Sequence, residues 1–351
     1  MDDELLNRFK LEATVFPEHT IHTTYKLKRQ QGPLREPVET KWILQDIIGH
    51  GAFGQVRLET CVKKDLLGRE MSQPRAVKRI FKSQMRAMKI DYKHELAALV
   101  RLSTPEYKEQ QIFVDFHGWF ETPEALFIAM EYVELGDLSK YIGEAITEID
   151  AVEVANDLLF GLKIMHSEGF THRDLKPQNI FVRQKRPQSS HWRVAIADFG
   201  ISKRVADEET ALRTTIGTPH YQAPEIRCYS IIGRPNEAES YSSAVDLWSL
   251  GCVMVQFVTG AVPFTHEAVL QRYCRNDKHF QTDPLSTKLG QEGVDFMQKL
   301  LAANPEQRPT ADDALGHPWF RSRDDIPHPL PEVTQASADH NAARQTEPSA
   351  P

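Results

Sequence analysis

The chain has 351 residues, of which 40% are hydrophobic and 26% are charged, and 42 Lys and Arg against 49 Asp and Glu give a formal net charge of −7. This composition is typical of a globular protein, and the acidic balance excludes binding of nucleic acid through bulk charge. The four cysteines (Cys61, Cys228, Cys252, Cys274) form no CxxC pair, so neither a disulfide framework nor a zinc ribbon is indicated and a reducing compartment is expected.

Targeting signals are not recognisable in the sequence. Residues 1–4 are Met-Asp-Asp-Glu, without the basic and apolar regions of a signal peptide. No apolar run approaches the roughly 20 residues that cross a bilayer. We therefore expect a cytoplasmic or nuclear location, with neither a membrane nor nucleic acid as partner.

Three regions differ in composition. Residues 1–41 mix charged and apolar residues without a sustained period and form an N-terminal extension to which no module is assigned. Residues 42–320 have globular composition and enough length for two lobes. Residues 321–351 are rich in Pro, Ala, Gln, Asp and Ser, which predicts a disordered tail.

The first part of the central block is rich in predicted strands. Apolar alternation predicts a strand at 42–44, and a glycine turn leads to a second strand around Val56 and Leu58. Further strands are predicted at 75–80, 113–120 and 125–133, and helical spacing of apolar residues predicts a helix at 90–102.

The second part is rich in predicted helices, at 149–166, 244–259, 292–302 and 311–315, with short strands at 180–182 and 194–197. A strand-rich part followed by a helix-rich part predicts an α+β fold with two lobes, at about 42–132 and about 137–320.

The glycine turn between the first two strands runs through Gly49, His50, Gly51, Ala52, Phe53 and Gly54 to Val56. Glycines let the backbone approach a polyphosphate and offer its N–H groups as donors. The turn opens no helix, unlike a dinucleotide-binding turn, and it lacks the Gly-Lys-Ser/Thr ending of a Walker A loop. A flap over phosphates and an ordinary glycine-rich hairpin turn are the two interpretations that remain.

Lys78 lies within an apolar predicted strand, where an unpaired ammonium group is unfavourable. Glu95, on the helix that follows, would be its partner and would hold Lys78 toward the α- and β-phosphate oxygens of a nucleotide. A lysine at the surface edge of the sheet is the alternative.

The most specific pattern is HRDLKPQN at residues 172–179, followed by DFG at 198–200. Together with the glycine turn, AVK at 76–78, Glu95 and APE at 223–225, it resembles the eukaryotic protein kinase family over residues 42–320. This resemblance implies the bilobal protein kinase fold, with a β-rich N-lobe and an α-helical C-lobe. It also implies an enzyme that uses ATP and Mg²⁺.

The resemblance implies a chemical role for each polar residue of these motifs. Asp174 would accept or orient the substrate hydroxyl, and Lys176 would steady the γ-phosphate. Asn179 and Asp198 would bind Mg²⁺ through hard oxygen ligands. Lys78, paired with Glu95, would position the phosphates.

The resemblance also predicts the nucleotide pocket. Besides the glycine turn, Val56 and Ala76, Met130 would gate its back, Glu131 to Val133 would bond the adenine edge, and Asp137 would lie near the ribose.

Three structural features are implied in the same way. Leu99, Phe116, His172 and Phe199 match an apolar spine between the lobes, which makes His172 a packing residue. Asp246 would anchor the catalytic loop, and Glu225 with Arg308 would form a buried ion pair.

The substrate class follows from two further motifs. Lys176, two residues after Asp174, and GTPHY at 217–221 are similar to kinases that act on Ser and Thr of protein substrates. Gln178 and Gln256 stand where basophilic relatives carry acidic residues, so no strong preference for several upstream basic residues is expected, although Asp137 and Glu134 could still recognise one. DFGISK at 198–203 and HPWF at 317–320 are similar to the calcium/calmodulin-dependent and checkpoint kinase group.

Arg173 beside Asp174 implies regulation, because such an arginine takes a phosphorylated residue as its anionic partner. Thr214 and Thr215 are the candidates, modified by an upstream kinase or by a second copy of the chain, although residues 213–215 also fit a plain polar loop. The tail lacks a basic amphipathic helix, so calmodulin binding is not expected. The alternative function is a pseudokinase scaffold that binds nucleotide without turnover.

Overall fold

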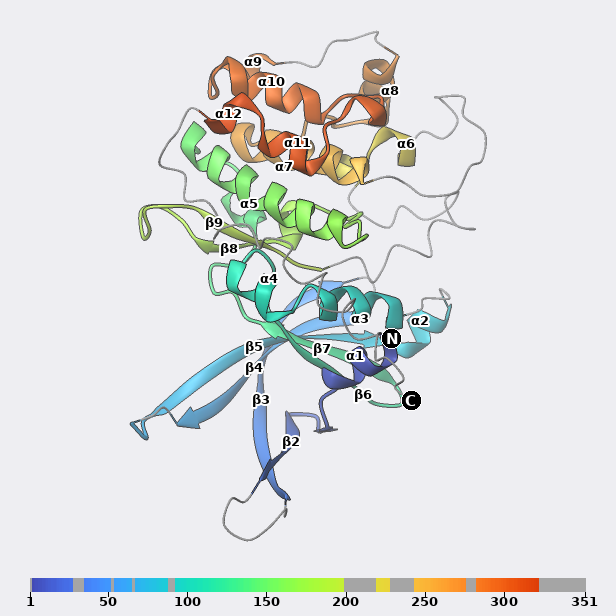
Figure 1. Cartoon of the computed structure of the whole chain (residues 1–351), viewed down its shortest axis with the longest axis vertical. Coiled ribbons are helices and arrows are strands. Elements are labelled where there is room, and N and C mark those ends of the chain that lie inside the picture. The colour runs from blue at the N-terminus through green and yellow to red at the C-terminus, as the bar shows by residue number, and fades with distance from the viewer. Residues whose placement is uncertain are drawn as a thin grey trace, which may run out of the picture.

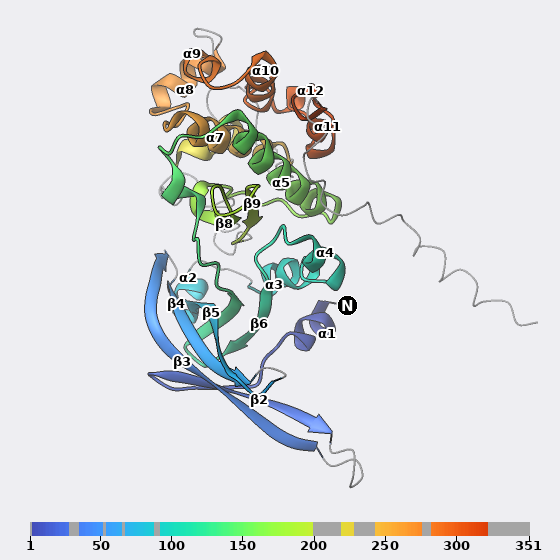
Figure 2. The same cartoon turned by 90° about the vertical axis from the view of Figure 1, so that its left-hand side faces the viewer.

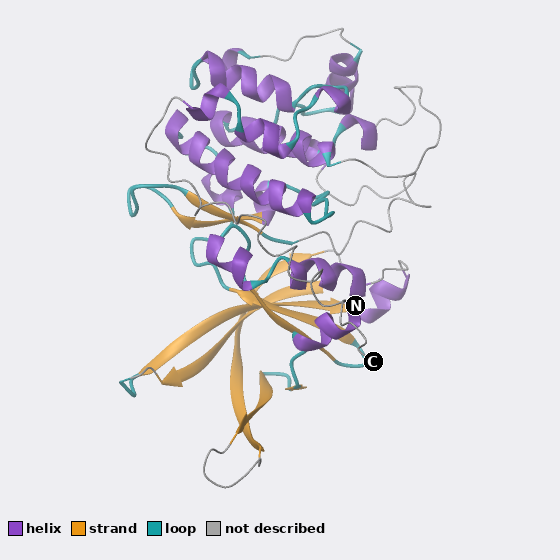
Figure 3. Ribbon diagram, in the orientation of Figure 1, coloured by secondary structure: helices purple, strands orange, loops and turns teal. Residues whose placement is uncertain are grey.

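A computed structural model of the chain describes residues 2–27, 35–51, 54–64, 67–87, 92–198, 219–227, 243–275 and 282–321. It has two lobes, one built on a seven-stranded sheet and one mostly helical (Figures 1 and 3). The α+β prediction with a bilobal fold is therefore confirmed. No helix in the described ranges is long and apolar enough to cross a membrane.

The elements of the first lobe are α1 (Asp2–Arg8), β1 (Ala13–Val15), β2 (His19–Leu27), β3 (Arg35–Gly51), β4 (Gly54–Lys64), β5 (Glu70–Phe81), α2 (Lys82–Ala87), α3 (Tyr92–Arg101), α4 (Pro105–Gln110), β6 (Phe116–Glu121) and β7 (Ala125–Glu131). The elements of the second lobe are η1 (Leu138–Tyr141), α5 (Glu148–Ser167), η2 (Pro177–Asn179), β8 (Ile180–Gln184), β9 (Arg193–Ile196), η4 (Pro219–Tyr221), α6 (Pro224–Arg227), α7 (Ala244–Thr259), α8 (Glu267–Cys274), α9 (Asp283–Ser286), α10 (Gln291–Leu300), η5 (Pro305–Gln307), α11 (Ala311–Leu315) and α12 (Pro318–Arg321).

The register of the antiparallel sheet gathers predicted pocket residues on one face. Its order is β1-β2-β3-β4-β5-β7-β6, in which Val56 pairs with Lys78 and Ala76 pairs with Met130. Cross-strand partners point to the same face of a sheet, as do residues two apart in one strand. The four side chains therefore share the face from which Lys78 and Met130 reach the pocket.

The N-terminal extension forms a helix and two strands that complete the first lobe. β2 pairs with β3 over nine residues, and β1 pairs with β2 at the edge of the sheet. The sequence does not show β2 as apolar alternation, because the side chains that this strand buries are polar. Thr20 and His22 are buried beside Arg57, Glu59 and Arg75.

The second lobe is organised around α5 and α7. A capping box begins α5, in which Thr147 Oγ1 accepts from Asp150 N at 3.2 Å and Asp150 Oδ2 accepts from Thr147 N at 2.8 Å. α5 packs against α7, α11 and the β8–β9 ribbon. α7 spans the predicted range and ends at Gly260, whose φ of 82° suits glycine. The predicted tail after Arg321 lies outside the described residues.

Candidate active site

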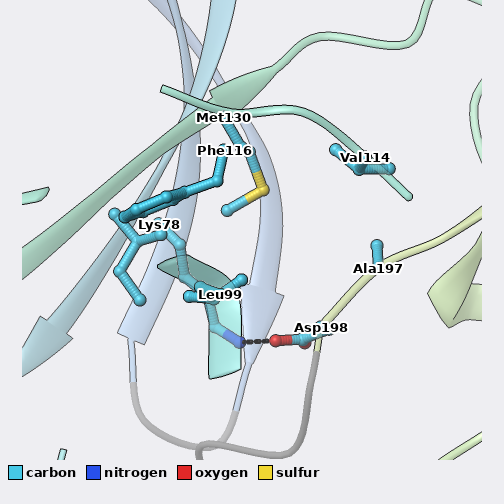
Figure 4. A pocket seen from close by; sticks show the side chains of 8 residues that line it. Lys78, Leu99, Val114, Phe116, Met130, Ala197 and Asp198 are labelled. Atoms are coloured by element: carbon cyan, nitrogen blue, oxygen red, sulfur yellow. Dashed lines mark hydrogen bonds and ion pairs between the residues drawn. The ribbon is translucent and has the colours of Figure 1, made fainter. Parts of the chain in front are cut away.

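A pocket lies where β5, α3, β6 and β7 of the first lobe face the end of β9 in the second (Figure 4). Its lining residues are Lys78, Leu99, Val114, Phe116, Ile128, Met130, Ala197 and Asp198. Lys78, Met130 and Asp198 were predicted to contact nucleotide or metal, and the structure brings them together here. Leu99 and Phe116, two members of the predicted spine, form part of the same wall.

Lys78 and Asp198 form an ion pair across the pocket, with Lys78 Nζ donating to Asp198 Oδ1 (Figure 4). Desolvation opposes ionisation of Asp198, but the charge of Lys78 and its hydrogen bond hold the pKa of Asp198 below its usual value. Asp198 has a left-handed backbone with φ 61°, a strained conformation often found at functional sites. The Glu95 side chain lies outside the described residues, so the Lys78–Glu95 pair stays a prediction.

The loop before β8 brings three predicted residues into contact. Lys176 Nζ donates to Asp174 Oδ2 at 2.9 Å. Asn179 Nδ2 donates to the backbone oxygen of Asp174 at 2.8 Å and reaches its Oδ2 at 3.3 Å. The loop thus holds the carboxylate of Asp174, the ammonium group of Lys176 and the side-chain amide of Asn179 next to one another.

Asp246 of α7 fixes the conformation of this loop from below. Its buried carboxylate accepts the backbone N–H groups of His172 and Arg173, each at 2.8 Å, and lies 2.9 Å from His166 Nε2. Arg173 has a left-handed φ of 62°, which these two bonds hold in place. The predicted anchor is therefore confirmed.

His172 is fully buried and its ring is bonded to the backbone on both sides. Nδ1 accepts from Asp174 N at 3.2 Å, so Nε2 carries the proton and donates to Ala197 O at 3.0 Å. This neutral, fixed ring agrees with the predicted packing role and joins the Asp174 loop to the segment that carries Asp198. The last member of the predicted spine, Phe199, lies outside the described residues.

The residues predicted to bond the adenine edge lie at and just after the end of β7. The Glu131 carboxylate is bonded to the Arg183 guanidinium of β8, with Nη2 to Oε2 at 2.7 Å, so its side chain is directed toward β8. Val133 is buried against Val114 and Ala197. Asp137 caps η1 by accepting from Ser139 N at 3.0 Å, a structural role in addition to the predicted ribose contact.

The packing of the hairpin requires glycine at one position of the turn, Gly54, but not at another, Gly49. A Cβ on Gly54 would lie 1.8 Å from Arg79 O on β5, so the approach of the strands requires glycine there. A Cβ on Gly49 would lie 3.6 Å from Val56 Cβ, an ordinary contact. The hairpin therefore explains Gly54 but not Gly49. His50 pairs with Gln55 and Gly51 with Gly54, whereas Ala52 and Phe53 lie outside the described residues.

Glu225 and Arg308 form the predicted buried ion pair, at 2.6 and 2.8 Å in a two-pronged arrangement. Arg308 also donates to the backbone oxygens of Ala302 and Ala244, at 2.8 and 3.1 Å. The predicted phosphorylation sites, Thr214 and Thr215, lie outside the described residues.

Sequence reasoning missed three apolar members of the pocket, Val114, Ile128 and Ala197. Ile128 is two residues from Met130 on β7, so strand alternation was a signal that could have found it. Ala197 directly precedes Asp198, and Val114 precedes β6 without a motif to mark it.

Comparison with known proteins gives a consistent result. Residues 42–320 match the protein kinase domain family. Over 287 residues the chain is 33% identical to serine/threonine-protein kinase RAD53 of Saccharomyces cerevisiae, covering 80% of this chain and 33% of RAD53. Over 238 residues it is 34% identical to serine/threonine-protein kinase cds1 of Schizosaccharomyces pombe, covering 66% of this chain and 49% of cds1. The chain thus spans between a third and a half of the length of these two relatives.

A calcium/calmodulin-dependent protein kinase type 1 of Macrobrachium nipponense is 32% identical over 307 residues, covering 86% of this chain and 81% of that protein. The crystal structure of Rad53 1-466 in complex with AMP-PNP superposes with a TM-score of 0.57 at 30% identity, covering 80% of this chain and 65% of that chain. The similarity to the checkpoint and calcium/calmodulin-dependent kinase group is confirmed.

Proposed function

The chain belongs to the protein kinase family, and we propose that it transfers the γ-phosphate of ATP to Ser and Thr hydroxyls of protein substrates. The observation that carries this proposal is the joining of Asp174, Lys176 and Asn179 by hydrogen bonds on a loop that His172 ties to the segment carrying Asp198. Phosphoryl transfer requires an aligned hydroxyl and neutralised charge more than covalent chemistry.

Each residue acts through the position that the fold gives it. Asp174 orients the acceptor hydroxyl and takes its proton, while Lys176, bonded to the same carboxylate, faces the charge on the γ-phosphate. Lys78 holds the α- and β-phosphates from β5. The backbone N–H groups around Gly49, where a Cβ would meet only Val56, would donate to the phosphates.

The donor set fits Mg²⁺. Asn179 directs its amide nitrogen to Asp174, so its amide oxygen would bind Mg²⁺ together with the carboxylate of Asp198. Mg²⁺ usually takes one or two protein carboxylates and its other ligands from phosphates and water, so two protein ligands are enough. When bound, Mg²⁺ neutralises phosphate charge.

The test is incorporation of radioactive phosphate from ATP with Mg²⁺ into myelin basic protein, followed by identification of the phosphorylated amino acids. We expect phosphoserine and phosphothreonine, and a loss of at least about 100-fold in Asp174→Ala. Asp312→Ala, which removes an exposed carboxylate on α11, is the matched control. Equal incorporation in wild type and Asp174→Ala would remove the mechanism. Binding of a fluorescent ATP analogue with no phosphate incorporation by wild type would instead indicate a pseudokinase.

We propose that phosphorylation of Thr214 or Thr215 activates the enzyme, by an upstream kinase or a second copy of the chain. The support is Arg173, whose backbone Asp246 fixes directly beside Asp174. Intact-mass measurement of active protein tests this regulation. Full activity with both threonines unmodified would contradict it.

The substrate preference is proposed to lack a strong requirement for several upstream basic residues. Gln256 accepts a hydrogen bond from the Tyr221 hydroxyl at 2.5 Å, so a neutral and already bonded amide stands at this position. A degenerate peptide array with each upstream position fixed as Arg measures the preference. Enrichment of Arg at several positions would contradict the proposal.

A further inference from the structure

Phe9, at the end of α1, stacks on a wall residue of the pocket. The rings of Phe9 and Phe116 have centroids 5.6 Å apart and an interplanar angle of 27°. Phe116 lines the pocket together with Leu99, Lys78 and Met130. A residue outside the range that matches the kinase family thus supports one wall of the pocket from behind.

Backbone hydrogen bonds fix the chain around Phe9 to β6. Trp119 N donates to Phe9 O at 3.0 Å, and Leu11 N donates to Trp119 O at 2.7 Å. Trp119 Nε1 also donates to Leu6 O at 3.0 Å. Lys10 Nζ donates to Glu121 Oε1 at 2.7 Å, so four hydrogen bonds join this segment to Trp119 and Glu121 of β6.

Gly118 permits this close approach. It has φ +132°, and a Cβ there would lie 2.7 Å from Phe9 O and 2.9 Å from Leu11 Cγ. β6 has an irregular register at this point, between Phe116 and Gly118. The strand is therefore shaped to receive the N-terminal segment, and a side chain at residue 118 would push that segment away.

The same segment also covers α3. α1 packs against α3 and lies beside it in both views (Figures 1 and 2). Leu6 is buried in one continuous core with Leu96 and Leu99 of α3 and with Phe116. Leu99 of α3 lines the pocket, and Glu95, the predicted partner of Lys78, belongs to the same helix. α1 therefore contacts the helix that contributes both residues.

We propose that the segment Asp2–Leu11 is a built-in positioning element of the kinase site, and that Phe9 is a positioning residue that holds Phe116 and α3 in place for nucleotide binding and phosphoryl transfer. Phe9 acts through Phe116 and touches no reacting atom. This inference rests on the proposed function, and it extends the catalytic unit beyond residues 42–320.

The experiment compares Phe9→Ala with Phe16→Ala in the full chain. Phe16 belongs to the same N-terminal extension, but this residue is 39% exposed and its ring stacks on His19. Gly118→Ala is compared with Gly143→Ala, a second glycine of positive φ around which a Cβ would meet nothing within 4 Å. Steady-state kcat and KM for ATP are measured with myelin basic protein, and amide hydrogen exchange is followed in α3 and α7.

We expect Phe9→Ala and Gly118→Ala to lower kcat/KM for ATP about tenfold, since small displacements of positioning groups have large effects on rate. We expect amides of α3 to exchange at least about tenfold faster in both, with those of α7 unchanged. Phe16→Ala and Gly143→Ala should stay within about twofold of wild type in both measurements, and Phe9→Tyr, which keeps the ring, should restore activity. Where Phe9→Ala does not fold, Phe9→Leu is measured against the same criteria.

The proposal is overturned if folded Phe9→Ala and Gly118→Ala keep kcat/KM and α3 exchange within about twofold of wild type. It is also overturned if they lose only thermal stability, since that outcome shows a structural role alone. The proposed function fails by a separate result, which is equal phosphate incorporation in wild type and Asp174→Ala. Hydrogen exchange in α3 does not depend on turnover, so it still decides whether Phe9 positions the helix.

Discussion

The ammonium group of Lys78 and the carboxylate of Asp198 are bonded to each other across the boundary between the lobes (Figure 4). The two residues are 120 positions apart in the chain, one on β5 and one two residues after the end of β9. A polyphosphate with its metal would meet both groups at once. They are therefore expected to act as one unit and not as two independent contributors.

This relationship predicts non-additive effects in a double-mutant cycle. Lys78→Met and Asp198→Asn should each lower kcat/KM for ATP by about 100-fold or more, because each removes charge from the same phosphate site. The kcat/KM of the double variant should lie no more than about tenfold below that of the less active single variant. Lys299→Met, which breaks an exposed pair with Asp295 on α10, serves as the control. Losses that multiply in the double variant would show that the two groups act separately.

A second prediction concerns the anchor of the catalytic loop. Asp246→Asn should lower kcat about 10- to 100-fold, because one of the N–H groups of His172 and Arg173 would then face an amide NH₂. The free energy of unfolding should fall by about 1–3 kcal/mol, the range for leaving a buried donor unsatisfied. Urea unfolding and steady-state kinetics measure the two effects. Asp283→Asn, at the exposed start of α9, should change neither, and an unchanged kcat in Asp246→Asn would refute the anchoring role.

A third prediction concerns the buried pair of the second lobe. Glu225→Gln should lower the free energy of unfolding by about 3–5 kcal/mol, because the Arg308 guanidinium would remain buried without its counter-charge. Arg308→Lys should also be destabilising, since one ammonium group cannot replace a two-pronged pair and the bonds to Ala302 O and Ala244 O together. Urea unfolding checks both variants. A stability within about 0.5 kcal/mol of wild type would show that water replaces the pair.

The helices of the second lobe were predictable because their apolar residues recur with a helical period over long stretches. α7 spans 244–259 as predicted, and α5 and α10 differ from prediction by one or two residues at each end. β1 and β2 were not predictable in this way. The side chains that β2 buries are Thr20 and His22, so the face that enters the lobe is polar and apolar alternation is absent.

The site was predictable as a set of residues but not as a set of contacts. Motif spacing identified Asp174, Lys176 and Asn179, and the structure joins them. The bond between Lys78 and Asp198 depends on how two lobes meet, which no local pattern records. Likewise, Phe9 lies in a segment without a motif. Its stacking on Phe116 and its close approach to Gly118 are visible only in the structure.

The buried polar face of β2 predicts a dependence of stability on pH. His22 Nδ1 lies 3.3 Å from Glu12 O, whereas its Nε2 is buried without a hydrogen-bond partner in the described part of the chain. Burial, together with the charge of Arg75, lowers the pKa of His22 from 6.5 to about 4. Between these two values the unfolded chain binds a proton that the folded chain does not, so this contribution to stability is present above pH 6.5 and is lost as pH falls toward 4.

His22→Gln tests this dependence because glutamine keeps a polar side chain that does not titrate. The stability of wild type relative to His22→Gln should fall by up to about 3 kcal/mol as the pH is lowered from 7 to 4, in urea unfolding measured at each pH. His266→Gln, at the exposed start of α8, is measured in parallel as the surface reference. A difference between wild type and His22→Gln that stays constant over this range would mean that the ring is protonated in the folded protein, and the buried face of β2 would then have to hold a charge beside Arg75.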